Sequence, residues 1–240
     1  MPQDDDDLQA CFDAAAANLT FNAPLGAARA ADLVERLAPP GAAENARALD
    51  LGCGPGELLL RLCARHDVPG DGVEQVADDL ERARAAATAR GLADRVAFHE
   101  ADASSWEGTA DVVLNVGAGY IWGDAPEALA ALHRHTRAGG RLLFGDGVYD
   151  AEPDAAVREV FGDLPGLAGL ARAATDAGFR VLHAAASSQA EWDDFESDWR
   201  AGVESVGTPA ARTFADERRE EYLSGYRGVV GFAWLVLTPA

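Results

Sequence analysis

The sequence predicts an α/β fold, namely a doubly wound, mostly parallel sheet of seven strands with a helical cover. Short apolar runs alternate with stretches of helical periodicity from residue 26 to residue 184, and this alternation is typical of parallel sheets. Gly and Pro separate most of these segments. A last apolar run near the end of the chain follows two helical stretches that have no strand between them.

The expected strands are short apolar runs that end at Gly or at polar residues. The first run leads directly into a cluster of glycines, and the second follows the turn formed by Pro69 and Gly70. The expected strands cover residues 46–51, 71–76, 95–100, 111–116, 141–145, 179–184 and 231–237.

The expected helices carry apolar residues at i, i+3, i+4 and i+7, as Ala30, Leu33, Val34 and Leu37 do. Glycines end several of these stretches, and the two glycines at 139–140 are expected to close the helix before the fifth strand. The expected helices cover residues 26–38, 57–66, 77–90, 126–137 and 167–177, followed by 191–206 and 209–226 in the cover.

The length of 240 residues allows one domain, at most two. Roughly fifty residues separate the apolar runs near 180 and 234, which is more than a simple connection needs. Residues 1–10 are polar and acidic, so we expect a frayed end. The expected parts are a tail and lead-in at 1–20, a core at 21–186, a helical cover at 187–228, and the final strand of the core at 229–240.

The charge balance disfavours two classes of partner. Forty Asp and Glu oppose twenty basic residues, all of them Arg, and the net charge is −20. Proteins that bind nucleic acid usually carry a basic surface, so neither nucleic acid nor an anionic membrane is an expected partner. The acidity has two explanations that stay open. One is GC-rich codon usage. Five Trp and nine Phe favour this explanation, because they give no sign of a reduced hydrophobic core. The other is the acidic surface of a halophile.

The cysteines and the first residues bear on localisation. Cys11, Cys53 and Cys63 have no spacing typical of a metal site, so we expect no metal and reduced thiols, as in a cytosol. The chain begins with acidic residues rather than with the basic start of a signal peptide. Its apolar runs are far shorter than a membrane span. We expect a cytoplasmic protein, and the oligomeric state stays open.

The strongest motif follows the first strand, where glycines alternate with other residues after Asp50. Gly52, Gly54 and Gly56 allow unusual backbone angles and the close approach of a ligand. The helix beyond them offers free N–H groups and the positive end of its dipole. One alternative is a turn that only packs the helix on the strand. Another is a dinucleotide site, which needs the third glycine one residue later and would bring Glu57 against a pyrophosphate.

The D-x-G-x-G-x-G spacing resembles motif I of the class I S-adenosylmethionine-dependent methyltransferases, whose cofactor carries no phosphate. Later segments fit the same family in order across residues 46–145, including the turn and strand at 138–144. More narrowly, the chain is similar to small bacterial members of largely unassigned substrate. The resemblance implies S-adenosyl-L-methionine as the cofactor. It also implies that Asp50 acts through the backbone and water near the methionine amine.

The end of the second expected strand carries an acid. Glu74 lies 22 residues after Gly52, and an acid at about this spacing commonly accepts hydrogen bonds from ribose hydroxyls. The alternative is an exposed acid in an acid-rich chain. The resemblance implies that Gln75 packs beside the adenine.

Two further candidates for the cofactor site follow the third and fourth strands. The resemblance implies that Asp102 meets the adenine amino group and that the backbone N–H of Ala103 meets a ring nitrogen. Many members of the family have Gly where this chain has Ala101, and Asp102 also fits the N-cap of a helix. The resemblance further implies that Asn115, near the end of the fourth strand, lies beside the methionine moiety.

Residues that contact the acceptor are expected after strands four and five. Tyr120 and Trp122 are the expected substrate-binding residues, because aromatic rings hold cationic or planar groups. Packing under the cover is the alternative for both. Asp146 and Tyr149 are catalytic candidates, since either side chain is able to orient or deprotonate an acceptor N–H or O–H.

The sequence therefore predicts an enzyme that transfers a methyl group from S-adenosylmethionine to a small-molecule acceptor by direct displacement. Positioning supplies most of the rate in such a reaction, so a general base is optional. Because no clear base stands out, the alternative is a non-enzymatic module that binds S-adenosylmethionine or S-adenosylhomocysteine as a sensor or partner. Whether N, O, S or C is methylated stays open.

Overall fold

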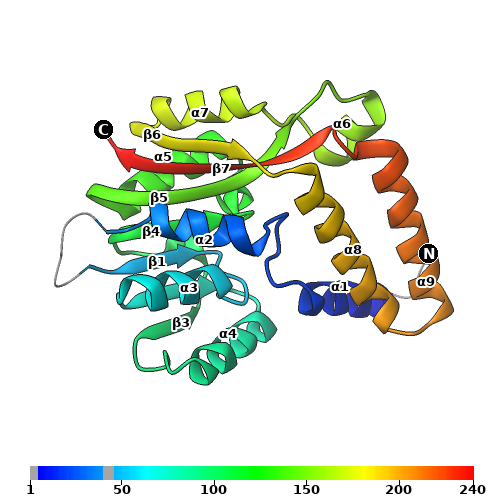
Figure 1. The fold of residues 1–240 in the computed structure, drawn as a ribbon, viewed down its shortest axis with the longest axis horizontal. Coiled ribbons are helices and arrows are strands. Elements are labelled where there is room, and N and C mark those ends of the chain that lie inside the picture. Colours follow the sequence, from blue (N-terminus) through cyan, green and yellow to red (C-terminus); the bar gives the residue numbers. More distant parts are fainter. Residues whose placement is uncertain (1–4, 40–45) are drawn as a thin grey trace. The chain divides into compact units, whose positions relative to one another are not determined.

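The computed structural model describes residues 5–39 and 46–240 (Figure 1). The chain divides into two compact units, each of which is described by itself. We call the first the sheet unit; it comprises Ala27–Gly147, Pro165–Ala186 and Ala233–Ala240. The second is the helical unit, which comprises Met1–Gly26, Val148–Leu164 and Ser187–Phe232.

A seven-stranded sheet forms the centre of the fold, in the order β3-β2-β1-β4-β5-β7-β6. The pairs β1–β2, β1–β4, β2–β3 and β4–β5 are parallel, and β6–β7 is antiparallel. The predicted fold class and the predicted number of strands are confirmed. The strands are β1 Ala48–Leu51, β2 Gly70–Glu74, β3 Val96–Glu100, β4 Ala110–Val116, β5 Thr136–Tyr149, β6 Phe179–Ala186 and β7 Val230–Pro239.

The strand order reverses at β1, which lies between β2 and β4. Asp50 of β1 is in register with Gly72 on one side and with Leu114 on the other. Because the three strands are parallel, the segments that follow them meet at one edge of the sheet. This edge is where open α/β sheets bind their ligands.

Helices flank the sheet within the sheet unit (Figure 1). Helix α3 packs against both α2 and α4, and α5 packs against α7. Their apolar faces are buried, as the complete burial of Leu33, Leu59, Leu80 and Leu129 shows. The helices are α2 Ala27–Arg36, α3 Glu57–His66, α4 Ala77–Ala89, α5 Ala125–His135 and α7 Leu167–Asp176, with short 3₁₀ turns η1 Ala103–Ser105 and η2 Gly119–Trp122.

The helical unit is built mainly from α8, which packs against both α1 and α9. Ser188 and Glu191 form a reciprocal capping box that starts α8, and Thr208 caps α9. After α9 the backbone widens into a π-helical segment, η3. The elements of this unit are α1 Asp5–Asn18, α6 Ala155–Phe161, α8 Gln189–Ser205, α9 Pro209–Glu220 and η3 Glu221–Tyr226.

The N-terminal segment differs from the prediction. Residues 5–10 were expected to fray, but they belong to α1; residues 1–4 lie outside the described part of the chain. Cys11 and Ala15 of this helix are buried in a cluster with Trp199 and Val203. A Cβ on Gly202 would lie 2.5 Å from the carbonyl oxygen of residue 14, so the missing side chain lets α1 and α8 pack closely. This stabilisation is tertiary, and the local composition does not reveal it.

Three other elements also depart from expectation. The glycines at 139–140 were expected to close the preceding helix, but α5 ends at His135 and β5 runs through both glycines. Both glycines lie in an irregular part of the strand: Thr136 pairs with Ala110 and Arg141 with Val112, so residues 137–140 bulge out of the pairing with β4. Gly139 is left-handed, with φ 74°, and a Cβ on Gly140 would lie 2.7 Å from the Asp111 carbonyl oxygen. The helix α6 was not predicted. The single helix expected at 209–226 is divided into α9 and η3.

A buried ion pair joins α8 to α9 inside the helical unit. The Glu196 side chain is completely buried and receives two hydrogen bonds from Arg218, at 2.9 and 2.8 Å. The hydroxyl of Tyr226 donates to the same carboxylate at 2.7 Å. The Arg218 guanidinium also lies 4.6 Å from the ring centre of Trp199. The pair costs desolvation energy, but the removal of one partner leaves a buried charge without compensation.

We expect Arg218→Met to lower the free energy of unfolding by about 3 kcal/mol, because it leaves the buried Glu196 carboxylate unpaired. Urea unfolding followed by tryptophan fluorescence measures the change. Arg219→Met is the matched control, since its ion pair with Asp216 is exposed and should contribute less than about 1 kcal/mol. Equal effects of the two substitutions would contradict a special role for the buried pair.

Candidate functional site

A turn of three left-handed glycines connects β1 to α3. Gly52, Gly54 and Gly56 have φ angles of 79°, 51° and 72°, a region that other residues rarely adopt. Two of the glycines are also closely packed: a Cβ would lie 2.5 Å from the side chain of Ala118 at Gly52, and 2.6 Å from that of Phe98 at Gly56. The spacing that the sequence analysis singled out is therefore required by the backbone.

Gly54 differs from its two neighbours because it faces open space. No atom lies within 4 Å of the position that its Cβ would take. Its N–H donates to Oε2 of Glu74 at 3.0 Å. The middle of the turn is thus available to a ligand, whereas its two ends are packed against the protein.

The Glu74 carboxylate ties the end of β2 to the glycine turn. Besides the bond from Gly54, it accepts hydrogen bonds from the backbone N–H groups of Gln75 and Val76, at 2.7 and 3.1 Å. Three charge-assisted hydrogen bonds of this kind hold a carboxylate in a fixed orientation. The side chain of Gln75 is exposed at the same end of the strand.

Asp50 lies in β1 just before the turn and is nearly buried, with 5% of its surface exposed. Burial, and then the charge of Glu74, raise the pKa of its carboxyl to about 7. Within the part of the chain that the structure describes, no side chain or backbone N–H donates to this carboxyl. A buried acid without a donor partner is stabilised in its charged form by a nearby cation, such as a ligand ammonium group.

Asn115 of β4 is completely buried beneath the turn. Its Nδ2 donates to the carbonyl oxygen of Leu51 at 2.7 Å, and its Oδ1 has no partner among the described residues. The side chain predicted to face a cofactor therefore holds the start of the glycine turn in this structure. Asn115 contributes to the site through the position of Leu51.

The segment after β3 carries Asp102 and Ala103. Both carboxylate oxygens of Asp102 bind Ser104, one through the backbone N–H and one through the hydroxyl, each at 2.8 Å. Asp102 thus caps η1, as the alternative reading predicted, while its side chain remains exposed. Ala103 is buried directly after it. A role of this pair toward adenine stays a prediction.

The loop after β4 contains the expected substrate-binding residues. Tyr120 is 77% exposed and Trp122 is partly exposed, both in η2. The exposed Tyr120 ring therefore does not serve the alternative role of a packing residue under the cover. Ala118 and Ile121, whose side chains border Gly52, are not among the predicted site residues. The glycines on both sides of Ala118 were the sequence signal for a close approach there.

The two catalytic candidates lie in different surroundings. Asp146 lies beside the loop after β4, because a Cβ on Gly119 would come within 3.0 Å of its Oδ2. Burial raises the pKa of Asp146, and its Oδ1 accepts a bond from the N–H of Gly147 at 2.8 Å. Tyr149 belongs to the helical unit and donates its hydroxyl to the carbonyl oxygen of Gly162 at 2.6 Å. This hydroxyl is already engaged in packing, so Asp146 is the better placed of the two.

Comparison with known proteins gives relatives for part of the chain. Residues 48–140 match a family described as a methyltransferase domain. The uncharacterized protein YjhP of Escherichia coli is 30% identical over 164 residues, which are 63% of this chain and 64% of YjhP. The 27-O-demethylrifamycin SV methyltransferase of Amycolatopsis mediterranei is 34% identical over 103 residues, which are 42% of this chain and 38% of that enzyme. The match therefore spans less than two thirds of either relative.

A solved structure matches over the full length. It is an S-adenosylmethionine-dependent methyltransferase of Geobacter sulfurreducens in complex with S-adenosyl-L-homocysteine. The two chains are 25% identical, each is covered completely, and the TM-score is 0.82.

We expect Gly54→Asp to abolish binding of S-adenosylhomocysteine while the protein remains folded, because the new side chain fills open space at the turn. Isothermal titration calorimetry measures the binding. Gly91→Asp is the matched control: Gly91 also has a positive φ, 66°, and also has no atom within 4 Å of its Cβ position. Unchanged affinity in Gly54→Asp would exclude the turn as the binding site.

We expect the raised pKa of Asp50 to make stability depend on pH. The folded protein retains the Asp50 proton up to about pH 7, whereas the unfolded chain releases it near 3.8. The free energy of unfolding therefore loses this contribution as the pH rises through that interval, by about 1.4 kcal/mol for each unit by which the two pKa values differ.

The test compares Asp50→Asn with the wild type by urea unfolding at about pH 5 and about pH 8. The variant should gain stability relative to the wild type at the higher pH. Asp94→Asn, a change at an exposed carboxylate, should show no such trend. A difference between Asp50→Asn and the wild type that does not change with pH would disprove the raised pKa.

Proposed function

We propose that the protein transfers a methyl group from S-adenosylmethionine to a small-molecule acceptor, because residues 48–140 match a family described as a methyltransferase domain and the whole chain is similar in structure to an S-adenosylmethionine-dependent methyltransferase. The observation that carries the proposal is the glycine turn, whose middle residue Gly54 faces open space next to two carboxyl side chains. Asp50 and Glu74 are these side chains, and they make the surroundings of the turn acidic.

The residues around the turn fit this cofactor better than a phosphate-bearing one. Asp50 has no donor partner among the described residues, and its raised pKa favours a cationic ligand group such as an ammonium. Two adjacent carboxyls would repel a pyrophosphate. When bound, S-adenosylmethionine supplies an electrophilic methyl group on a positively charged sulfur. The residues proposed to hold it are Asp50, Gly52, Gly54, Gly56, Glu74, Gln75, Asp102, Ala103 and Asn115.

The chain's own residues prepare this site in distinct ways. Glu74 is fixed by its three backbone donors and keeps acceptor capacity for ligand hydroxyls. Asn115 holds the Leu51 carbonyl and thereby the start of the turn. Asp146 is the group proposed to orient the acceptor or to hold its proton at Oδ2, because it lies beside the loop after β4 and burial raises its pKa, which makes it a stronger base than an exposed Asp. Tyr120 and Trp122 are proposed to contact the acceptor.

The proposed acceptor is a small molecule rather than a nucleic acid. The net charge of −20 opposes a polyanion, and the name of the rifamycin relative gives a small-molecule acceptor for that enzyme. No helix among the described residues has the length and apolar character needed to span a bilayer. We propose a cytoplasmic location, which the three free thiols support.

The proposal predicts that the protein labels a compound in a small-molecule extract of bacterial cells when it is given methyl-deuterated S-adenosylmethionine. Mass spectrometry should detect a product with the mass of one deuterated methyl group, together with S-adenosylhomocysteine. Gly91→Asp should form the same product, and Gly54→Asp should form none.

Two results would contradict the proposal. In a parallel assay with a whole-cell lysate, label found only in nucleic acid or protein would disprove the small-molecule acceptor. Tight binding of S-adenosylhomocysteine with no methylated product from any extract would favour the alternative, a non-enzymatic binding module.

A further inference from the structure

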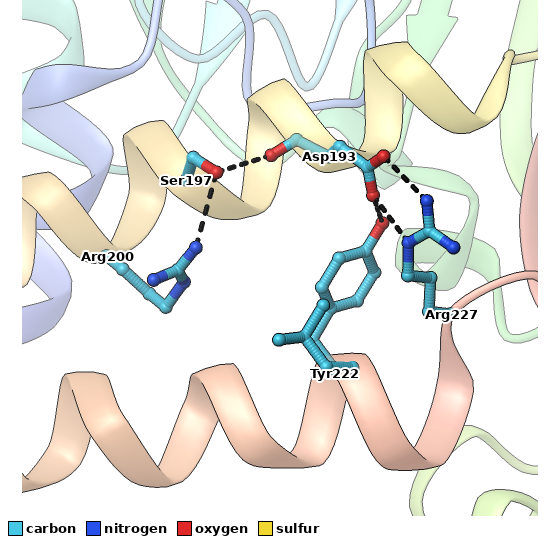
Figure 2. A pocket seen from close by; sticks show the side chains of 6 residues that line it. Asp193, Ser197, Arg200, Tyr222 and Arg227 are labelled. Atoms are coloured by element: carbon cyan, nitrogen blue, oxygen red, sulfur yellow. Dashed lines mark hydrogen bonds and ion pairs between the residues drawn. The ribbon is translucent and has the colours of Figure 1, made fainter.

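A groove of about 340 Å³ lies between α8 and η3 in the helical unit (Figure 2). Its volume is at the lower end of the range for small-molecule sites, roughly 300–1,000 Å³. All of its lining residues belong to the helical unit, and none of them is among the residues of the proposed cofactor site. The lining residues are Asp193, Ser197, Arg200, Tyr222, Leu223 and Arg227.

One wall of the groove is a polar stripe on α8. Asp193, Ser197 and Arg200 follow one another at i, i+4 and i+7, which places them on one face of the helix. The Ser197 hydroxyl donates to the backbone carbonyl of Asp193 at 2.7 Å and accepts from Nη2 of Arg200 at 3.2 Å (Figure 2). The hydroxyl proton of Ser197 is therefore already used, so the guanidinium of Arg200 is the donor that this wall offers to a ligand.

The opposite wall is formed by η3 and the residue that follows it. Arg227 binds both carboxylate oxygens of Asp193, at 2.8 and 2.9 Å, and the hydroxyl of Tyr222 donates to the same carboxylate at 2.7 Å. The hydrogen bond from Arg227 is the main cause that lowers the pKa of Asp193 to about 2. The positive charge of Arg227 thus neutralises the negative charge of Asp193, the one acid among the lining residues that the structure describes. Leu223 adds an apolar surface that is 56% exposed.

The charge of Arg200 is not matched. No carboxylate of the described residues lies within ion-pair distance of its guanidinium, although the chain has twice as many acids as arginines. Its Nε is buried and has no hydrogen-bond partner among these residues. Because Nε is closed off from solvent, a ligand oxyanion would bind the guanidinium at its terminal Nη groups, of which, within the described part of the chain, only Nη2 has a bond, to Ser197.

A π-helical segment forms part of this groove. Such segments are rare and occur frequently at functional sites, because the wider turn displaces side chains from regular helical positions. Here the segment carries Tyr222 and Leu223, which supply the polar and the apolar part of one wall.

We infer that this groove binds a small organic oxyanion, a carboxylate or a phosphate ester, through the guanidinium of Arg200, with the apolar part of the ligand against Leu223. The matched pair of Asp193 and Arg227 leaves one net positive charge for the ligand. Guanidinium groups suit this class because their planar donors bind two oxygens of one carboxylate or phosphate. The site is independent of methyl transfer.

The test is a nuclear magnetic resonance titration of the full chain with two probes, hexanoate and inorganic phosphate, at constant ionic strength. The Nε–Hε signals of the arginines are followed, and the Arg200 signal is assigned by its loss in Arg200→Gln. A saturable shift of this signal with hexanoate is expected. Saturation with hexanoate alone assigns a carboxylate with an apolar part, and saturation with phosphate as well assigns oxyanions in general.

Matched variants separate the groove from the general effect of charge. Followed through the Nε–Hε signal of Arg227, which lines the same groove, Arg200→Gln should weaken hexanoate binding about tenfold relative to the wild type, since a hydrogen bond to a charged group is lost. Arg212→Gln removes the same charge from an exposed position on α9 outside the groove and should leave the affinity unchanged. Both variants are checked for folding by thermal unfolding.

Two outcomes would overturn the inference. One is the absence of a saturable Arg200 shift with either probe. The other is an equal, non-saturating drift of all arginine signals, which would be an effect of ions in solution. Leu223→Gln gives a second measurement on a folded groove: it should weaken hexanoate binding and leave the phosphate response unchanged.

Discussion

The turn between β1 and α3 depends on three residues in the left-handed backbone conformation, which glycine adopts without strain. At this point the strand order reverses, so the turn must fit between the segments that follow β2 and β4. Gly52 fits against Ala118 and Gly56 against Phe98 at distances that no Cβ would permit. The packing of both ends fixes the path of the turn. Gly54, between them, is left with its backbone exposed to open space.

The two carboxyls near the turn take different roles because their hydrogen-bond partners differ. Glu74 accepts three backbone N–H groups, which compensate its charge and fix its orientation. Asp50 is nearly buried, has no such donor among the described residues, and lies within the field of Glu74, so its pKa rises. Glu74 is thus an oriented acceptor for hydroxyl groups. A nearby cation would stabilise the charged form of Asp50. This division is consistent with a ligand that carries both groups and no phosphate.

The sequence predicts the glycine turn well because the spacing of glycines encodes backbone angles locally. Helix α3 begins directly after Gly56 and ends at His66, as the apolar periodicity predicts. Features that depend on distant contacts are not predictable in this way. Residues 5–10 form a helix because α8 covers Cys11 and Ala15, and the glycines at 139–140 form a bulge because β5 already begins to pair with β4 at Thr136, before them. The direction of the Asn115 side chain likewise depends on the carbonyl of Leu51.

In the helical unit, the sequence likewise does not reveal which charged residues pair with one another. Asp193, Glu196 and Arg200 lie within two turns of α8, and the sequence does not indicate which of them is paired. Residues more than twenty positions away decide this: Arg218 compensates Glu196 in the interior, and Arg227 compensates Asp193 at the groove. The third charge, on Arg200, receives no counter-charge from any described segment packed against α8. Asp193 and Glu196 are already compensated, and the exposed Asp194 and Asp198 of the same stretch form no ion pair with Arg200 among the described residues. A ligand oxyanion would therefore supply the acceptor that this guanidinium lacks.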